Sequence, residues 1–184
     1  MKKRAISLVL LLFLSGCSAS RQIERGMALR AALLRSGGSF DTKITADYGD
    51  MVYTFSEECT FTDTGNVSFT VAAPETIAGI TGHITEKGGN LTFDDTALQF
   101  PLLADDQLSP VSAPWILIKT LRSGYLTAAG EENGLLKLTI DDSYDEDALH
   151  LDIWLDETDR PVRAEIRYDD RRILSMAVEN FVIG

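Results

Sequence analysis

The sequence has few residues that could crosslink a fold or carry out catalysis. Two of its 184 residues are cysteines, Cys17 and Cys59, and two are histidines. A motif described below uses Cys17, so Cys59 has no partner for an internal disulfide and the domain must rely on its hydrophobic core. The sequence also contains no G-x-S-x-G, P-loop, G-x-G-x-x-G or paired-cysteine metal motif. We therefore predict that the protein is not an enzyme and has no catalytic residues, no metal site and no cofactor.

Positive charge is scarce as well. The sequence has 17 lysines and arginines and 28 aspartates and glutamates, which gives a formal net charge of −11. Three of the cations lie in the first four residues, and removal of residues 1–16 would leave 168 residues with a charge of −14. Such acidity argues against a nucleic-acid partner and against electrostatic adhesion to anionic lipid.

No apolar run is long enough to span a membrane. The longest predominantly apolar stretch, Ala5–Leu14, has ten residues, whereas a membrane-spanning helix needs about 20. It follows a basic start and ends in Leu14-Ser15-Gly16-Cys17, which resembles the bacterial lipobox at the end of a secretory signal peptide. The resemblance implies that residues 1–16 are removed and that Cys17 becomes a diacylglyceryl, palmitate-bearing N-terminus.

Such a lipid anchor implies a place in the cell envelope, on the extracytoplasmic face of a bacterial membrane. Two or more acyl chains suffice for stable anchoring. The sequence leaves open whether this membrane is the cytoplasmic or the outer one. We expect a short tether at residues 17–22 and a single domain at residues 23–184.

The first segment of that domain is predicted to be a helix from Arg21 to Arg35. Its apolar residues recur at steps of three and four, as on one face of a helix, namely Ile23, Met27, Ala31 and Leu34. The Ser36-Gly37-Gly38-Ser39 run ends it. We expect this stripe to pack on the body of the domain; the alternative is a helix that lies in the membrane interface.

From Phe40 onward the dominant hydrophobic period is two. Apolar and polar residues alternate in several stretches, including 67–72, 136–140, 149–156 and 162–168. Turn-forming sequences separate these stretches at 48–50, 63–66, 87–90, 133–134 and 169–170. This pattern is typical of antiparallel strands with one buried and one solvated face.

One stretch departs from the alternation. Residues 102–113 are irregular, and a short helix is predicted to start at Ser112 and to end near Arg122. The predicted fold class is therefore α+β: a strongly curved antiparallel sheet, a half-barrel of about nine to eleven strands, with two helices on its concave side.

This pattern resembles the LolA/LolB-like superfamily of lipoprotein carriers and receptors. The resemblance covers residues 23–183 and is clearest in two places, the Val67–Pro74 strand that runs into a proline and the three-strand segment Leu149–Phe181. It implies a hydrophobic cavity that holds acyl chains or another apolar ligand. The carrier has an arginine shortly after its proline, where this chain has Glu75, Thr76 and Ile77, so we do not expect its lid switch here.

Seven apolar residues are our candidates for the lining of such a cavity: Phe55, Phe69, Phe93, Trp115, Leu117, Ile118 and Leu121. A chain of this length must bury many apolar side chains merely to fold. Alternation does not distinguish a hollow interior from a filled one, so both interpretations stay open.

Polar residues offer weaker candidates. Asp141, Ser143, Asp145 and Asp147 have the spacing of a calcium loop, but Glu146 occupies the position that needs glycine, so we predict an acidic hairpin loop. His83 and His150 are expected on solvated strand faces, and Cys59 is expected to be buried.

Our leading hypothesis is thus a membrane-anchored envelope lipoprotein that binds a hydrophobic or lipidic ligand. The alternative is a structural or protein-partner-binding lipoprotein with a filled core. The sequence identifies no protein partner.

Overall fold

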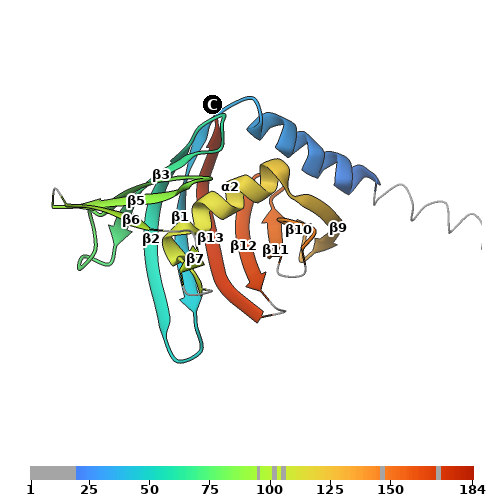
Figure 1. Ribbon diagram of the computed structural model, residues 1–184. Helices are drawn as coiled ribbons and strands as arrows, with labels where there is room; N and C mark the ends of the chain where they lie inside the picture. The colour runs from blue at the N-terminus through green and yellow to red at the C-terminus, as the bar shows by residue number, and fades with distance from the viewer. Residues whose placement is uncertain (1–19, 95, 101–102, 105–106, 146–147, 169–170) are drawn as a thin grey trace, which may run out of the picture.

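A single antiparallel sheet of eleven strands dominates the structure (Figure 1). The computed structural model describes residues 20–184 except 95, 101–102, 105–106, 146–147 and 169–170. The predicted signal peptide and Cys17 lie outside the described residues. The strand order in this sheet is β6-β5-β4-β3-β2-β1-β13-β12-β11-β10-β9. The strands that come first and last in the sequence, β1 and β13, therefore pair with each other in the middle of the sheet.

Several strands show the predicted alternation of buried and exposed residues, and the chain turns at the predicted positions 48–50, 63–66 and 133–134. Their bounds are β1 (Gly38–Asp47), β2 (Val52–Phe61), β3 (Val67–Ala73), β4 (Thr81–Thr85), β5 (Gly88–Phe93), β6 (Thr96–Phe100), β9 (Tyr125–Glu132), β10 (Leu135–Asp141), β11 (His150–Leu155), β12 (Pro161–Tyr168) and β13 (Arg171–Ile183). A separate two-stranded hairpin consists of β7 (Leu103–Ala104) and β8 (Gln107–Leu108). At the tight β9–β10 turn, Asn133 and Gly134 both have positive φ, which explains this Asn-Gly pair.

The predicted second helix covers the concave side of the sheet. A short 3₁₀ turn, η1 (Pro110–Ser112), leads into α2 (Ala113–Ser123), and the sheet curves around α2 (Figure 1). Eight of its eleven residues are buried. At one end of β1, β2 and β13, Phe40, Phe61 and Phe181 pack together with ring centroids 5.5–6.2 Å apart. The predicted α+β half-barrel with two helices is confirmed.

The N-terminal helix, residues 20–33, packs on the sheet with a different face from the one predicted. Its buried residues are Gly26, Leu29 and Leu33. A Cβ added to Gly26 would lie 3.1 Å from the Leu138 side chain, so glycine allows the helix to approach β10 closely. The helix begins at residue 20, one residue before the predicted start at Arg21, and ends at residue 33.

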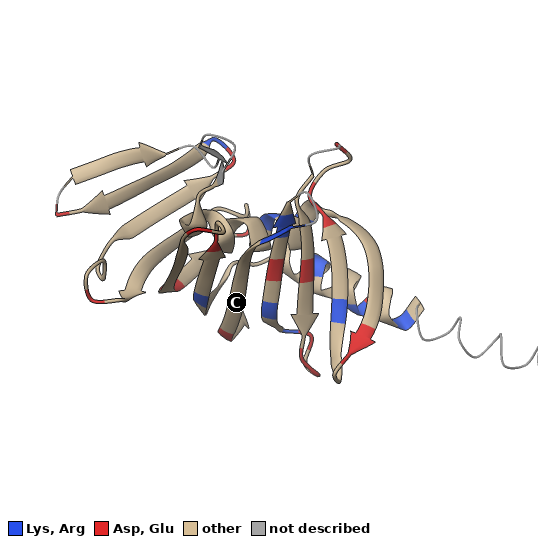
Figure 2. Cartoon of the chain, turned by 90° about the horizontal axis from the view of Figure 1, so that it is seen from below, with Lys and Arg blue, Asp and Glu red and all other residues tan. Residues whose placement is uncertain are grey.

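The outer face of β11 is another correction. We expected Asp152 and Trp154 to be solvated, but both are buried because cationic side chains from the neighbouring strands cover them. Lys137 and Arg163 lie over the Trp154 ring at 4.9 and 4.4 Å from its centroid. Asp152 pairs with Lys137 at 3.1 Å and with Arg167. Figure 2 shows basic and acidic positions close together on neighbouring strands of the sheet.

Within the described residues, no helix combines the length and apolarity that crossing a membrane requires.

Candidate functional site

An apolar pocket of about 280 Å³ opens beside the first half of α2. The helix contributes Trp115, Ile116 and Lys119. The other lining residues come from the β4–β5 turn, β8 and the β10–β11 connection: Glu86, Leu108, Asp142 and Leu149. Small-molecule sites are typically apolar and measure about 300–1,000 Å³, so this pocket lies just below that range. It can take a short apolar segment of a ligand.

Charged residues form the rim of this pocket. Lys119 Nζ lies 3.5 Å from Asp142 Oδ2 and 5.4 Å from the centroid of the Trp115 ring. Asp142 Oδ1 also accepts a hydrogen bond from the Leu149 backbone N–H at 2.8 Å. The pocket therefore combines an apolar interior with a polar entrance, where a polar headgroup can stay in water.

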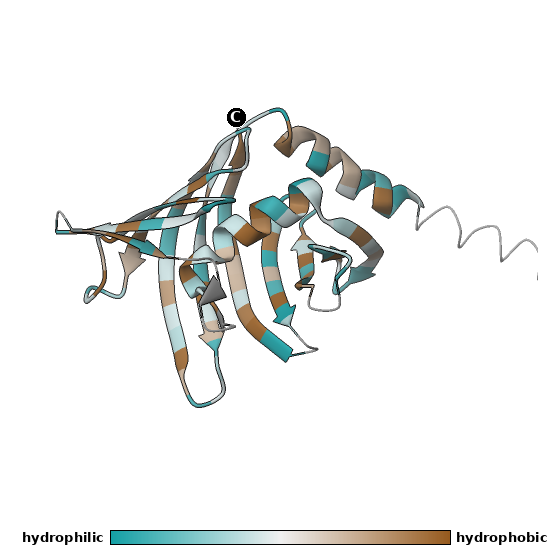
Figure 3. Ribbon diagram, viewed as in Figure 1, coloured by the Kyte–Doolittle hydropathy of each residue, from teal (hydrophilic) through white to brown (hydrophobic). Residues whose placement is uncertain are grey.

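Six of the seven predicted lining residues are buried in the hydrophobic core. They belong to the core cluster that joins α2 to the strands of the sheet: Phe55, Phe69, Trp115, Leu117, Ile118 and Leu121. Trp115 is the member that also lines the pocket. Phe93, at the end of β5, is 48% exposed and lies outside the cluster. Figure 3 shows hydrophobic residues both on α2 and on the strands behind it.

Glu57 lies within this apolar interior, and the sequence analysis did not select it as a site residue. It occupies the concave face of β2, where alternation also places Phe55 and Cys59, and it is 1% exposed. Within the described part of the chain, neither carboxylate oxygen has a hydrogen-bond partner. The hydroxyl of Thr42, directly across on β1, donates to the Ala177 carbonyl instead, at 3.0 Å. Burial raises the pKa of Glu57 well above its usual value and so favours the neutral acid.

The alternation in β2 pointed to Glu57, because Glu57 is two residues from both Phe55 and Cys59 and therefore shares their buried face. Leu108 and Glu86 offered no comparable signal, since two separate segments bring them to the pocket.

Two arginines tie the end of α2 to the N-terminal helix. Arg30 donates to the carbonyls of Leu121 and Gly124, at 2.8 and 2.6 Å, and Arg122 of α2 donates back to the Leu33 carbonyl. Burial lowers the pKa of Arg30 from its usual value, although a guanidinium stays charged in proteins. Charged donors at these carbonyls also complement the negative end of the helix dipole. The C-terminal end of α2 is therefore held firmly.

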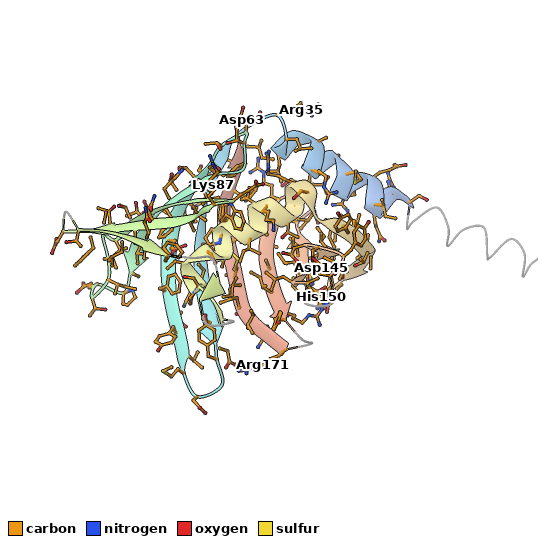
Figure 4. All side chains as sticks on the ribbon, viewed as in Figure 1. Arg35, Asp63, Lys87, Asp145, His150 and Arg171 are labelled. Carbon is orange, nitrogen blue, oxygen red and sulfur yellow. The ribbon has the colours of Figure 1, made fainter. Side chains whose placement is uncertain are left out.

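The other polar candidates have local hydrogen-bond partners. His150 Nδ1 lies 2.7 Å from Asp141 Oδ1, and His83 Nδ1 lies 3.0 Å from the Ser68 hydroxyl. His150 and Asp145 lie at the same end of the molecule (Figure 4). The described residues of the acidic loop, which exclude 146–147, belong to no cluster of three or more potential metal ligands. Cys59 is buried, and burial raises the pKa of its thiol.

Comparison with solved structures identifies similar chains at low sequence identity. A conserved protein from Thermus thermophilus has a TM-score of 0.48 at 11% identity, over 91% of this chain and 88% of that one. A LolA superfamily protein from Nitrosomonas europaea has a TM-score of 0.48 at 8% identity, over 86% and 93%. The lipoprotein LppX from Mycobacterium tuberculosis has a TM-score of 0.43 at 9% identity, over 88% and 93%. No protein-family model and no curated protein sequence matches the chain.

Proposed function

We propose that this chain is a non-enzymatic envelope lipoprotein, anchored through an acylated Cys17, that binds a hydrophobic or lipidic ligand on the concave side of its sheet. The observation that carries the proposal is the apolar pocket beside α2, with Trp115 in both the pocket and the buried cluster. A ligand that enters the pocket is therefore already in contact with the wall of the interior.

Burial of apolar ligand surface supplies the binding free energy. At roughly 25 cal/mol per Å², about 200 Å² of buried ligand surface contributes about 5 kcal/mol, before the cost of ordering the ligand. Lys119 and Asp142 at the rim remain available to a polar headgroup.

A longer acyl chain requires α2 to move, because its buried side chains pack against the sheet. Arg30 and Arg122 hold the C-terminal end of the helix. The N-terminal end, which carries Trp115 and Ile116, is therefore the end that opens. Ligand chains would pass beneath it toward Phe55 and the rest of the cluster.

Glu57 supplies the interior with a polar group that a ligand could satisfy. As a neutral acid it offers both a donor and an acceptor. A hydroxyl or carboxyl group on the ligand that reached Glu57 would remove the cost of leaving it without a partner.

Native mass spectrometry and fatty-acid binding test this proposal. The lipidated protein is expressed in a bacterial envelope, and its mass is compared with those of Leu149→Trp and Leu91→Trp. Leu149 lines the pocket, whereas Leu91 is a similarly half-buried leucine outside it. We expect the wild type and Leu91→Trp to carry lipid and to bind a fluorescent fatty acid, and Leu149→Trp to bind it at least about tenfold more weakly, because the indole fills the pocket.

A protein without bound lipid that takes up no fluorescent fatty acid would contradict ligand binding. That outcome favours the second candidate function, a partner-binding lipoprotein with a filled core. The observation behind this alternative is the edge strand β6, where four of the five residues are exposed, including Leu98. An edge strand of this kind offers unpaired backbone groups to a strand of a partner.

A further inference from the structure

The N-terminal helix has a second apolar stripe on its outer face. Ile23, Met27 and Leu34 are 45%, 46% and 51% exposed, and the small residue Ala31 lies between the last two and is exposed as well. These residues follow a helical spacing of four, four and three, so they form one continuous line along the helix. The helix needs Gly26, Leu29 and Leu33 to pack on the sheet, and it does not need this stripe.

The charge of this segment is opposite to that of the rest of the protein. Residues 20–35 contain four arginines and one glutamate, for a charge of +3, whereas residues 36–184 contain ten cations and 27 acids, for −17. Arg25 and Arg30 bind the body, to Asp159 at 2.6 Å and to the end of α2. Arg21 and Arg35, near the two ends of the stripe, are exposed.

Chain length limits where a membrane could lie. Ser18 and Ala19 are the residues between Cys17 and the first described residue of the helix. Three fully extended residues span about 11 Å. An acyl chain on Cys17 therefore keeps the start of the helix within about 11 Å of the lipid headgroups.

We propose that the outer stripe of the N-terminal helix lies in the membrane interface, with Ile23, Met27 and Leu34 against the acyl chains of an anionic bilayer. The inference rests on the acylated Cys17 of the proposed function and is independent of ligand binding. The exposed Arg21 and Arg35 extend to the headgroups, as long basic side chains do at membrane surfaces. The net charge of the whole protein argues against adhesion to anionic lipid. This net charge is the sum over a basic helix and an acidic body, and the helix is the part that would contact the lipid.

A second apolar site lies at the other end of the molecule and serves as a control. Met51, Val52 and Tyr53 are exposed at the β1–β2 turn. Figure 4 labels Arg171, which contacts this turn, at the end of the molecule opposite Arg35. Asp47 and Asp50 flank the turn, so an anionic surface repels it.

The test measures contact with lipid directly. Met27→Cys and, as the control, Val52→Cys are each labelled with an environment-sensitive NBD dye on the full lipidated protein. Both positions are exposed, so the fold should tolerate the change, whereas the buried Cys59 should not react. The labelled proteins are placed in phosphatidylglycerol–phosphatidylcholine vesicles whose acyl chains carry bromine, a quencher of the dye.

We expect the dye at position 27 to shift to the blue and to lose emission in brominated vesicles, and the dye at position 52 to do neither. The double substitution Ile23→Asp with Leu34→Asp places two negative charges on the stripe and should abolish the quenching at position 27. Quenching at position 52 alone would overturn the proposed orientation. A blue shift at position 27 without vesicles would also overturn it, because a second copy of the chain would then cover the stripe.

The lipid anchor is tested separately by measuring the intact mass of the protein. A chain without added lipid on Cys17 would refute both the anchor and this orientation of the helix. It would leave the proposal of ligand binding unaffected.

Discussion

Replacing Glu57 should make the protein more stable at neutral pH. Its carboxyl group is 1% exposed, and within the described residues neither of its oxygens has a hydrogen-bond partner. Glu57→Gln removes the ionisable proton and retains a polar group of the same shape. Glu57→Leu removes the polar group as well. The two substitutions therefore separate the cost of charge from the cost of an unsatisfied hydrogen bond.

The pH dependence follows from the direction of the pKa shift. Burial raises the pKa of Glu57 in the folded protein, while glutamates in the unfolded chain titrate near 4.3. Above that pH the unfolded chain has lost a proton that the folded protein still holds, so stability falls as pH rises. The slope from this residue is about 1.4 kcal/mol per pH unit, and it ends when the pH passes the folded-state pKa.

Glu57→Gln should match the wild type in stability near pH 4 and exceed it increasingly toward pH 7.5. Glu57→Leu should add about 1–3 kcal/mol more, because no buried polar group is then left without a partner. Urea unfolding followed by tryptophan fluorescence at several pH values measures both effects. Glu58→Gln, at the exposed neighbouring position, is the matched control and should change little.

A Glu57→Gln variant that is no more stable than the wild type at pH 7.5 would contradict the raised pKa of Glu57. The same holds if the two proteins lose stability with pH at the same rate. Either result would mean that Glu57 is ionised in the folded protein and is satisfied there by water or by a bound ligand.

Three further predictions rest on other contacts. Arg30→Met should lower the free energy of unfolding by about 2 kcal/mol in urea titrations, because two carbonyls at the end of α2 lose charged donors. Gly82→Ala should cost about 1–3 kcal/mol, because its methyl group overlaps the buried Phe69 ring; Gly130→Ala, with open space around it, is the control, and equal melting temperatures would contradict this. Cys59 should resist thiol reagents in the folded protein and react in urea, because burial raises its pKa; fast labelling of the native state would refute this.

Local patterns were sufficient to predict α2 and the strands with regular alternation. In β11, Leu151, Ile153 and Leu155 are buried as their spacing indicated, because a strand directs alternate side chains to opposite faces. Six of the seven candidate lining residues are buried in the core, and Phe93 is exposed. Its strand, β5, lies next to the edge of the sheet, where α2 does not cover it.

The same reasoning chose the wrong face of the N-terminal helix. The segment carries two apolar stripes, and periodicity alone weights both of them equally. Packing decided between them, because Gly26 lets the helix approach Leu138 more closely than a larger side chain would. The burial of Asp152 and Trp154 depended in the same way on cations from the adjacent strands.

By itself the sequence determined which residues of each strand share a face, where the chain turns and where α2 lies. These properties depend on a few neighbouring residues and on backbone geometry. The pocket, the surroundings of Glu57 and the exposed stripe were decided only by the tertiary structure. Each depends on which distant segments meet once β1 pairs with β13 and the sheet curves around α2. The packing of the whole domain determines which side chains meet across such contacts, and the periodicity of a single segment does not specify them.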